Sequence, residues 1–192
     1  MLPKLALPAF VLMVLVQLYV PARMIFQKEQ VIMDGKEFRF RTAPIDPNDP
    51  FRGKYITLSF NATEVKVQDS VDWYTGDPVF VYLTTDSAGY AIIQSVTKDQ
   101  PFELDDYVNA TVDYVIADTV STVFISYPFD RFYMEESKAP AAEQIYNEAA
   151  VDTNQVAYAV VMIKSGEAVV RDVMIDGVSI LDLIKKQQEN PQ

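Results

Sequence analysis

The chain has 192 residues, of which 49% are hydrophobic and 22% are charged, so it is long enough for a folded domain with a real core. It contains neither Cys nor His, which excludes disulfides, thiolate and imidazole chemistry and the usual zinc ligands, and we expect neither a metal nor a cofactor. The net charge of −11 is uneven: residues 1–41 hold six Lys or Arg against three Asp or Glu, and the remainder holds ten against twenty-four. Because this acidic remainder repels nucleic-acid phosphates, we expect no nucleic-acid partner.

The first predicted element is an apolar helix. Leu2 to Phe26 is interrupted by few polar residues, and a membrane span needs about 20 residues. We therefore predict a membrane anchor, or uncleaved signal, in residues 1–26, in contact with membrane lipid, and a single mainly β domain in residues 27–192. The alternative is a cleaved signal peptide, because Val20, Pro21 and Ala22 form a passable cleavage site.

The orientation of this anchor follows from two opposing arguments. The basic residues after the span outnumber Lys4, which by the positive-inside rule favours a cytoplasmic body. A four-residue tail gives that rule little to count, and a signal anchor ahead of a long folded body commonly exports it. We therefore expect a single-pass protein whose body lies outside the cytoplasm.

Strand patterns dominate the rest of the chain. In 37–41, Phe38 and Phe40 alternate with Arg39 and Arg41, and 55–60 alternates in the same way. Further strands are predicted at 78–84, 90–96, 107–117, 120–127, 155–163 and 168–175, and the short connections between them favour hairpins. The expected fold class is mainly β, an antiparallel sandwich or open barrel.

Two helical segments interrupt the strands. Residues 137–150 place Ala142, Ile145, Tyr146 and Ala149 on one face at helical spacing, and Ser137 is the predicted cap. A second helix is predicted over 180–186, before the polar C-terminal residues. The longer helix is expected to pack across the sheet.

Polar residues cluster in the loop and strand that follow Pro44. Asp46, Asp49, Arg52 and Tyr55 place carboxylates before a cation at the start of a strand. One interpretation is structural: the Asp side chains form Asx turns and Arg52 locks the loop by charge-assisted hydrogen bonds. The other is a ligand site.

A second cluster contains Arg131, Tyr133 and Glu135, between a strand and the longer helix. In the functional interpretation, Arg52 and Arg131 form the walls of an anion-binding groove and the tyrosines line its sides. In the structural interpretation, these residues form an ion-pair network. No spacing of carboxylates indicates a metal site.

The motif Gly-Lys-Tyr-Ile-Thr-Leu-Ser-Phe at 53–60 resembles the signature of the GDYXXLXY family of uncharacterised, membrane-anchored bacterial proteins. The N-terminal span and the segments 76–96 and 127–135 occur in similar order, so the resemblance covers most of the chain. Two positions depart from the signature: Lys54 replaces Asp and Phe60 replaces the final Tyr. The resemblance implies a place in the bacterial inner membrane, beside polytopic membrane proteins.

These observations favour a membrane-anchored, non-catalytic extracytoplasmic module that binds or supports a membrane-protein partner. The alternatives are a hydrolase of an envelope substrate that uses neither His nor Cys, with Arg52, Arg131 and Glu135 converging in a cleft, and a small-anion or solute-binding domain. A concave pocket lined by both Arg clusters would favour the alternatives, and a flat apolar or edge-strand patch would favour the module.

Overall fold

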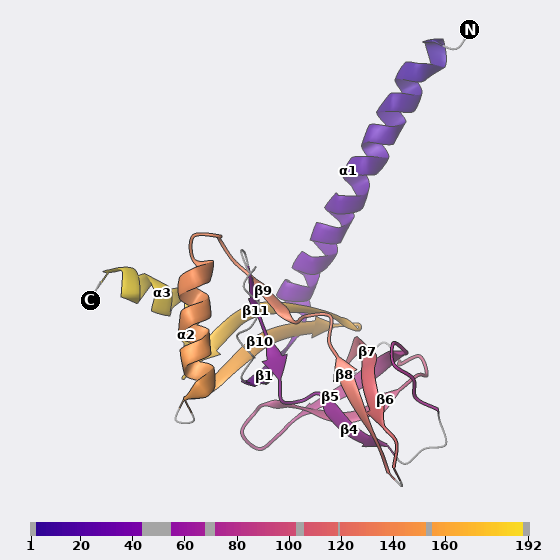
Figure 1. The fold of residues 1–192 in the computed structure, drawn as a ribbon. Helices are drawn as coiled ribbons and strands as arrows, with labels where there is room; N and C mark the ends of the chain where they lie inside the picture. Colours follow the sequence, from indigo (N-terminus) through magenta and orange to yellow (C-terminus); the bar gives the residue numbers. More distant parts are fainter. Residues whose placement is uncertain are drawn as a thin grey trace.

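The computed structural model describes residues 3–43, 55–67, 72–102, 106–118, 120–152 and 155–189. The N-terminal helix α1 (Pro3–Asp34) stands away from a mainly β body (Figure 1). The body consists of antiparallel strands and two shorter helices. The predicted fold class, mainly β and antiparallel with an apolar N-terminal helix, is confirmed, and the helix continues eight residues past Phe26.

The first sheet carries the chain from α1 into the body. Its strands pair antiparallel in the order β12-β11-β10-β1-β3. Their bounds are β1 Lys36–Ala43, β3 Ser59–Phe60, β10 Ala157–Lys164, β11 Glu167–Ile175 and β12 Val178–Ser179. The alternation in β1 has the predicted result, because Phe38 and Phe40 are buried while Arg39 and Arg41 are exposed.

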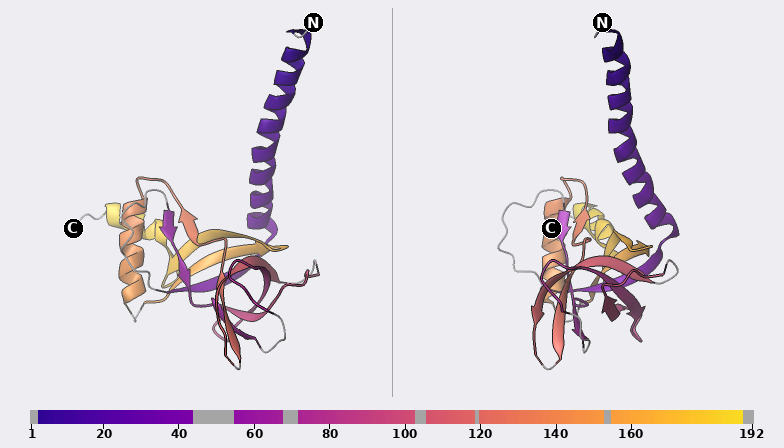
Figure 2. Two further views of the ribbon diagram at one scale, coloured as in Figure 1. Left: turned by 45° about the vertical axis from the view of Figure 1, so that its right-hand side comes forward. Right: turned by 90° about the vertical axis from the view of Figure 1, so that its right-hand side faces the viewer.

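The second sheet curls into a nearly closed barrel (Figure 2). Its strands pair antiparallel in the order β4-β8-β7-β5-β6. Their bounds are β4 Glu64–Val67, β5 Pro78–Thr85, β6 Ala91–Thr97, β7 Tyr107–Ile116 and β8 Ser121–Ser126. The edge strands β4 and β6 contact each other, and β6 also contacts β1. The two sheets therefore enclose one core.

A two-stranded ribbon joins β2 (Tyr55–Thr57) to β9 (Arg131–Tyr133). The single strand predicted over 55–60 is divided at Leu58, whose N–H donates to the carbonyl of Asp130 at 2.7 Å. Residues before Leu58 pair with β9, and those after it pair with β1. The chain thus changes its pairing strand from β9 to β1 at Leu58. Ile56, Leu58 and Phe60 nevertheless all remain buried on one side, as the alternation predicts.

The two helices of the body lie side by side at the end of the first sheet that is remote from α1 (Figure 1). They are α2 (Ala139–Val151) and α3 (Ile180–Glu189). The prediction that Ser137 caps α2 is wrong. The N-cap is Lys138, which makes no side-chain capping bond, because a turn closed by the Lys138 N–H and the Glu135 carbonyl at 2.9 Å places Ser137 before the helix.

The centre of the core is aromatic. The rings of Phe40, Phe60, Tyr127 and Phe129 contact one another, with centroids 4.9–6.1 Å apart. These residues come from β1, β3 and the segment after β8, so the cluster joins the two sheets. Such pairs add to the free energy gained by burying the rings themselves.

Candidate functional site

Three of the predicted site residues meet on the outer face of the ribbon. Tyr55 lies opposite Tyr133, with ring centroids 5.4 Å apart. Arg131 projects on the same side, and its guanidinium carbon is 5.0 Å from the centre of the Tyr55 ring. The other face of the ribbon is buried through Ile56 and Phe132. Tyr55, Arg131 and Tyr133 therefore form one surface cluster.

The charge of Arg131 is engaged by neighbours in its own segment. Its Nε lies 3.7 Å from a carboxylate oxygen of Asp130. A hydrogen bond with Tyr133, followed by the charge of Asp130, raises the pKa of the guanidinium above its ordinary value. About half of each side chain in the ion pair is exposed, so water screens the interaction. The cluster is a cation that lies over the Tyr55 ring, hydrogen-bonds with Tyr133 and has the carboxylate of Asp130 beside it.

Of the remaining predicted site residues, Glu135 is the one that lies in the described part of the chain. Glu135 forms an ion pair with Lys138 at 3.0 Å, one helical turn further along. Asp46, Asp49 and Arg52 lie outside the described residues. Arg131 lines neither of the two clefts described below. The anion-binding groove between Arg52 and Arg131 stays a prediction.

A different site lies where α1 meets the hairpin of β10 and β11. Lys28 of the helix reaches Glu167 of the hairpin, with 2.5 Å between the ammonium nitrogen and a carboxylate oxygen. Asp34 forms a second ion pair with Lys164 at 2.9 Å. Between them Val31 is only 4% exposed, which makes it the apolar contact of this junction. The base of α1 is therefore packed on the body along nearly two turns.

Gly35 permits this close packing. Its N–H donates to the carbonyl of Val31 at 2.9 Å and so ends the helix. A Cβ atom at this position would lie 2.3 Å from that carbonyl oxygen and 3.1 Å from the backbone of Ile163. Only glycine fits without displacement of backbone, so Gly35 sets how closely the helix approaches β10.

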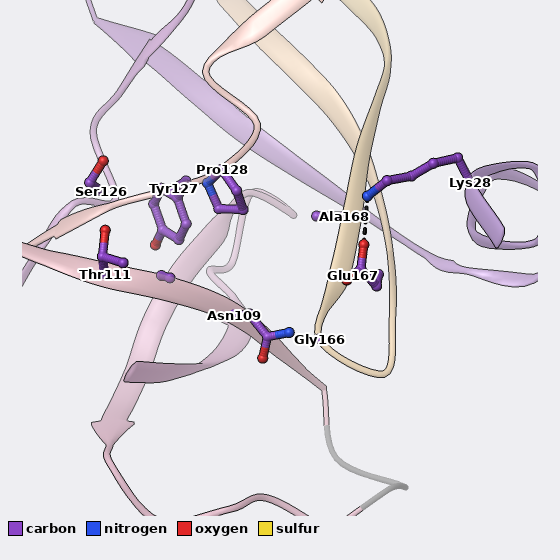
Figure 3. A pocket seen from close by; sticks show the side chains of 10 residues that line it. Lys28, Asn109, Thr111, Ser126, Tyr127, Pro128, Gly166, Glu167 and Ala168 are labelled. Atoms are coloured by element: carbon purple, nitrogen blue, oxygen red, sulfur yellow. Dashed lines mark hydrogen bonds and ion pairs between the residues drawn. The ribbon is translucent and has the colours of Figure 1, made fainter. Parts of the chain in front are cut away.

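Two open clefts flank the Lys28–Glu167 pair. The first, which we call the helix-base cleft, has a volume of about 520 Å³ and lies between α1 and the hairpin. It is lined by Met24, Gln27, Lys28, Gln30, Val31, Lys164, Ser165 and Glu167. The second, which we call the sheet cleft, has a volume of about 340 Å³ and lies on the other side of the pair, towards β7 (Figure 3).

The sheet cleft is walled by polar side chains of two strands. Figure 3 shows Lys28 reaching Glu167 from the helix, with Asn109, Thr111 and Ser126 further into the cleft. Tyr127 also lines it, but its hydroxyl donates to the carbonyl of Ala62 at 2.7 Å, and burial raises the pKa of that hydroxyl. The walls can form hydrogen bonds with a polar group, while Tyr127 keeps its proton near neutral pH.

The geometry provides no assembled metal centre in the described ranges. Among these residues no group of three Asp or Glu side chains comes close enough to hold a metal ion. The cations at the helix base, Lys28 and Lys164, are each paired with a carboxylate. With its described side chains, the site at the base of α1 can hold a polar or apolar chain segment against the helix.

The two clefts were not predicted from the sequence, although two local signals marked their walls. Met24, at the end of the predicted span, is followed at helical spacing by Lys28 and Val31 beyond it. Residues 164–167 were predicted as a hairpin turn, and Gly166 there has a φ of +82°. The contact between these segments joins residues 139 positions apart, which no local pattern indicates.

The fold and this junction define a class: a mainly β body carried directly on one helix that is long and apolar enough to span a membrane. Within that class, the chain belongs to the GDYXXLXY family, described as GDYXXLXY protein, which it matches over residues 17–173. No curated protein and no solved structure matches the chain. The resemblance inferred from the sequence is thus confirmed.

The described part of the family motif lies on the strand that crosses from the ribbon to the first sheet. Tyr55 contributes to the surface cluster, and Leu58 is buried where the strand changes partner. Phe60 is 5% exposed within the aromatic core, 5.4 Å from Phe40. This burial explains why a ring without a hydroxyl is accommodated at the final position of the motif. Gly53 and Lys54 lie outside the described residues.

Proposed function

We propose that the chain is a membrane-anchored, non-catalytic module that stands on the extracytoplasmic side of a bacterial inner membrane and binds or supports a membrane-protein partner. The observation that carries this proposal is the continuity of α1, which exposes its apolar side chains and then runs without interruption into its contacts with the body. Membrane contact and body orientation are therefore coupled through one continuous helix.

The exposed apolar surface of α1 is what a bilayer requires. Leu7, Leu18 and Phe26 are 71%, 66% and 60% exposed, and the most apolar window of the helix has a mean hydropathy of 1.9. About 20 residues from Leu7 to Phe26 span about 30 Å, the thickness of the hydrocarbon region. An apolar surface of this size, if it were exposed to water, would favour aggregation of the protein.

The body is then held close to the membrane surface. The eight helical residues from Gln27 to Asp34 span only about 12 Å, and they carry the ion pairs to Glu167 and Lys164. A module fixed at this distance can reach the extracytoplasmic loops and helix ends of a neighbouring membrane protein. The helix-base cleft opens at this level.

The orientation and the membrane rest on the sequence and the family. A single apolar span that precedes a long folded body is typical of an exported signal anchor. The GDYXXLXY resemblance implies bacterial membrane proteins that accompany polytopic partners. Both support an inner-membrane protein with its body outside the cytoplasm.

Site-specific crosslinking in the native membrane tests this function. A photo-crosslinking side chain placed at Gln27, in the helix-base cleft, should give an adduct with one polytopic membrane protein at near-stoichiometric yield. The same side chain at Gln187, an exposed position of α3 at the remote end of the body, is the matched control and should give little adduct (Figure 1). Repeated absence of an adduct from Gln27, in a protein that is present in the membrane, would overturn the proposal.

A further inference from the structure

Gln17 is a polar residue at the middle of the apolar helix. It is the only polar residue from Leu5 to Val20, and it lies close to the midpoint of the segment from Leu7 to Phe26. Its side chain is exposed, as are those of its neighbours Val16 and Leu18 at 55% and 66%. In a bilayer this position is about 15 Å from either edge of the hydrocarbon region.

The amide of Gln17 requires hydrogen-bond partners at that depth. A glutamine side chain offers two donor hydrogens and an acceptor oxygen, and the hydrocarbon region contains no water to satisfy them. The backbone offers no donor for it, because the N–H groups along this part of α1 are used within the helix, and Pro21, which has no N–H, leaves the carbonyl of Gln17 without a helical donor as well. Transfer of an unpaired amide into hydrocarbon is costly, whereas a polar side chain on a second membrane helix satisfies it.

The direction of Gln17 is set by the helix itself. At about 100° per residue, positions seven and eleven residues further along return to within about 20° of the same direction. These positions are Met24 and Lys28, which line the helix-base cleft. The side of α1 that carries Gln17 in the span is therefore the side that faces the hairpin of β10 and β11 below it.

We infer that the Gln17 face of α1 binds a transmembrane helix of another membrane protein. The Gln17 amide hydrogen-bonds with a polar side chain at mid-bilayer depth of that helix, and the helix-base cleft receives the end of the helix or the loop that follows it. This inference rests on the proposed function, and it names the surface through which the partner is held.

The occupant is a different protein rather than a second copy of this chain. The body of each copy lies on the Gln17 side of its own helix, so two parallel copies packed through Gln17 would bring both bodies into the same space. The bodies would also repel each other, because residues 42–192 hold ten Lys or Arg against twenty-four Asp or Glu. A partner whose chain is short beyond the membrane avoids both conflicts.

Photo-crosslinking from two positions at nearly equal depth in the membrane tests whether the partner helix binds the Gln17 face of α1. Met13 lies about 40° from the direction of Gln17, and Leu15 lies about 160° from it. Both side chains are similarly exposed, at 51% and 59%. In the full-length protein in its native membrane, a photo-crosslinking side chain at Met13 should give an adduct whose attached peptide maps to a transmembrane helix of another protein. The same side chain at Leu15 should give at least severalfold less.

Moving the amide tests its role. Gln17→Leu should lower the adduct from Met13 by about 3- to 30-fold, the range that follows from one hydrogen bond between membrane helices. The double substitution L15Q/Q17L keeps the composition of the helix and moves the amide to the opposite face, so it should not restore the adduct. Gln17→Asn, which keeps an amide on the same face, should restore most of it.

Several outcomes would overturn the inference. They are equal adducts from Met13 and Leu15, an adduct that consists of two copies of this chain, no adduct from Met13, or an adduct insensitive to Gln17→Leu. Resistance of each variant to alkaline extraction from membranes separates these results from a failure of the proposed function. A wild-type chain that is extracted, or that lacks its N-terminal segment, would contradict the anchoring itself.

Discussion

Helix α1 and the β body contain the same kinds of apolar side chain in opposite surroundings. Phe10 and Phe26 of the helix are 58% and 60% exposed, whereas Phe38 and Phe40 of β1 are 1% and 0% exposed. Only a short segment separates the two pairs in the chain. Burial in the body comes from packing against other strands, while the helix leaves its apolar surface to another medium.

This difference divides the molecule into two energetic units that meet at the base of α1. The core of the body should determine whether the domain folds, and the apolar residues of α1 should determine whether the chain stays in a membrane. Gln27 to Asp34 belong to both units, because they continue the helix and contact the hairpin. Substitutions in one unit should leave the property of the other unchanged, which can be tested.

The largest effect is expected from Phe40→Ala. Phe40 is fully buried and contacts the rings of Phe60, Tyr127 and Phe129, so its loss leaves a cavity between the two sheets. The free energy of unfolding of the body should fall by about 3–5 kcal/mol in urea denaturation. The fraction of chain that resists alkaline extraction should not change. Parallel loss of membrane attachment would contradict the division into two units.

The converse substitution is Leu15→Asp. Leu15 lies near the middle of the span and away from the Gln17 face, and a carboxylate there opposes insertion by about 2.5–3.5 kcal/mol. The chain should shift from the membrane to the soluble fraction. The urea unfolding midpoint of the body should remain that of the wild type, since Leu15 does not belong to the buried core. A lowered midpoint would show that the helix supports the fold.

An intermediate effect is expected from Tyr127→Phe. This change keeps the ring in the aromatic core but removes the hydroxyl that donates to the carbonyl of Ala62 at 2.7 Å. The free energy of unfolding should fall by about 1–2 kcal/mol, because the carbonyl loses its partner. Phe129→Tyr, which adds a hydroxyl to a neighbouring buried ring, is a useful contrast and should also destabilise. No change for Tyr127→Phe would show that water replaces the hydroxyl.

The smallest effect is a dependence of stability on acid. Asp77 accepts hydrogen bonds from Lys98 and from the N–H of Tyr74, and the Lys98 bond, followed by the Tyr74 bond, lowers the pKa of the carboxyl. A lowered pKa in the folded state means that the unfolded state binds the proton first as pH falls. The stabilisation is therefore complete above the ordinary carboxyl range and is lost below about pH 4.

Asp77→Asn tests this dependence. The melting temperature of the variant should fall less between pH 5 and pH 3 than that of the wild type. The reason is that the variant lacks the stabilisation by the ionised Asp77 carboxylate at every pH. Asp113→Asn, which removes an exposed carboxylate of β7, controls for the change in net charge. Equal slopes for the wild type and Asp77→Asn would contradict the assigned cause.

Several elements could be predicted because their signals are local. The alternation around Phe38 and Phe40 identified β1 and its buried face, and the short connections between predicted strands indicated the hairpins of the second sheet. Three short strands, β4, β9 and β12, were missed because runs of two to four residues carry too little periodicity. Ser137 was a reasonable cap by residue type, but the preceding turn moved the helix start to Ala139.

The sequence by itself determined the apolar helix, the mainly β class and the absence of Cys and His, because these depend on composition and on short periods. Only the tertiary structure decided that Arg131 stacks on Tyr55 and that Lys28 meets Glu167 beside two clefts. The physical reason is that a local pattern reports which face of an element is apolar. Strand order, register and the closure of a sheet decide which distant faces meet.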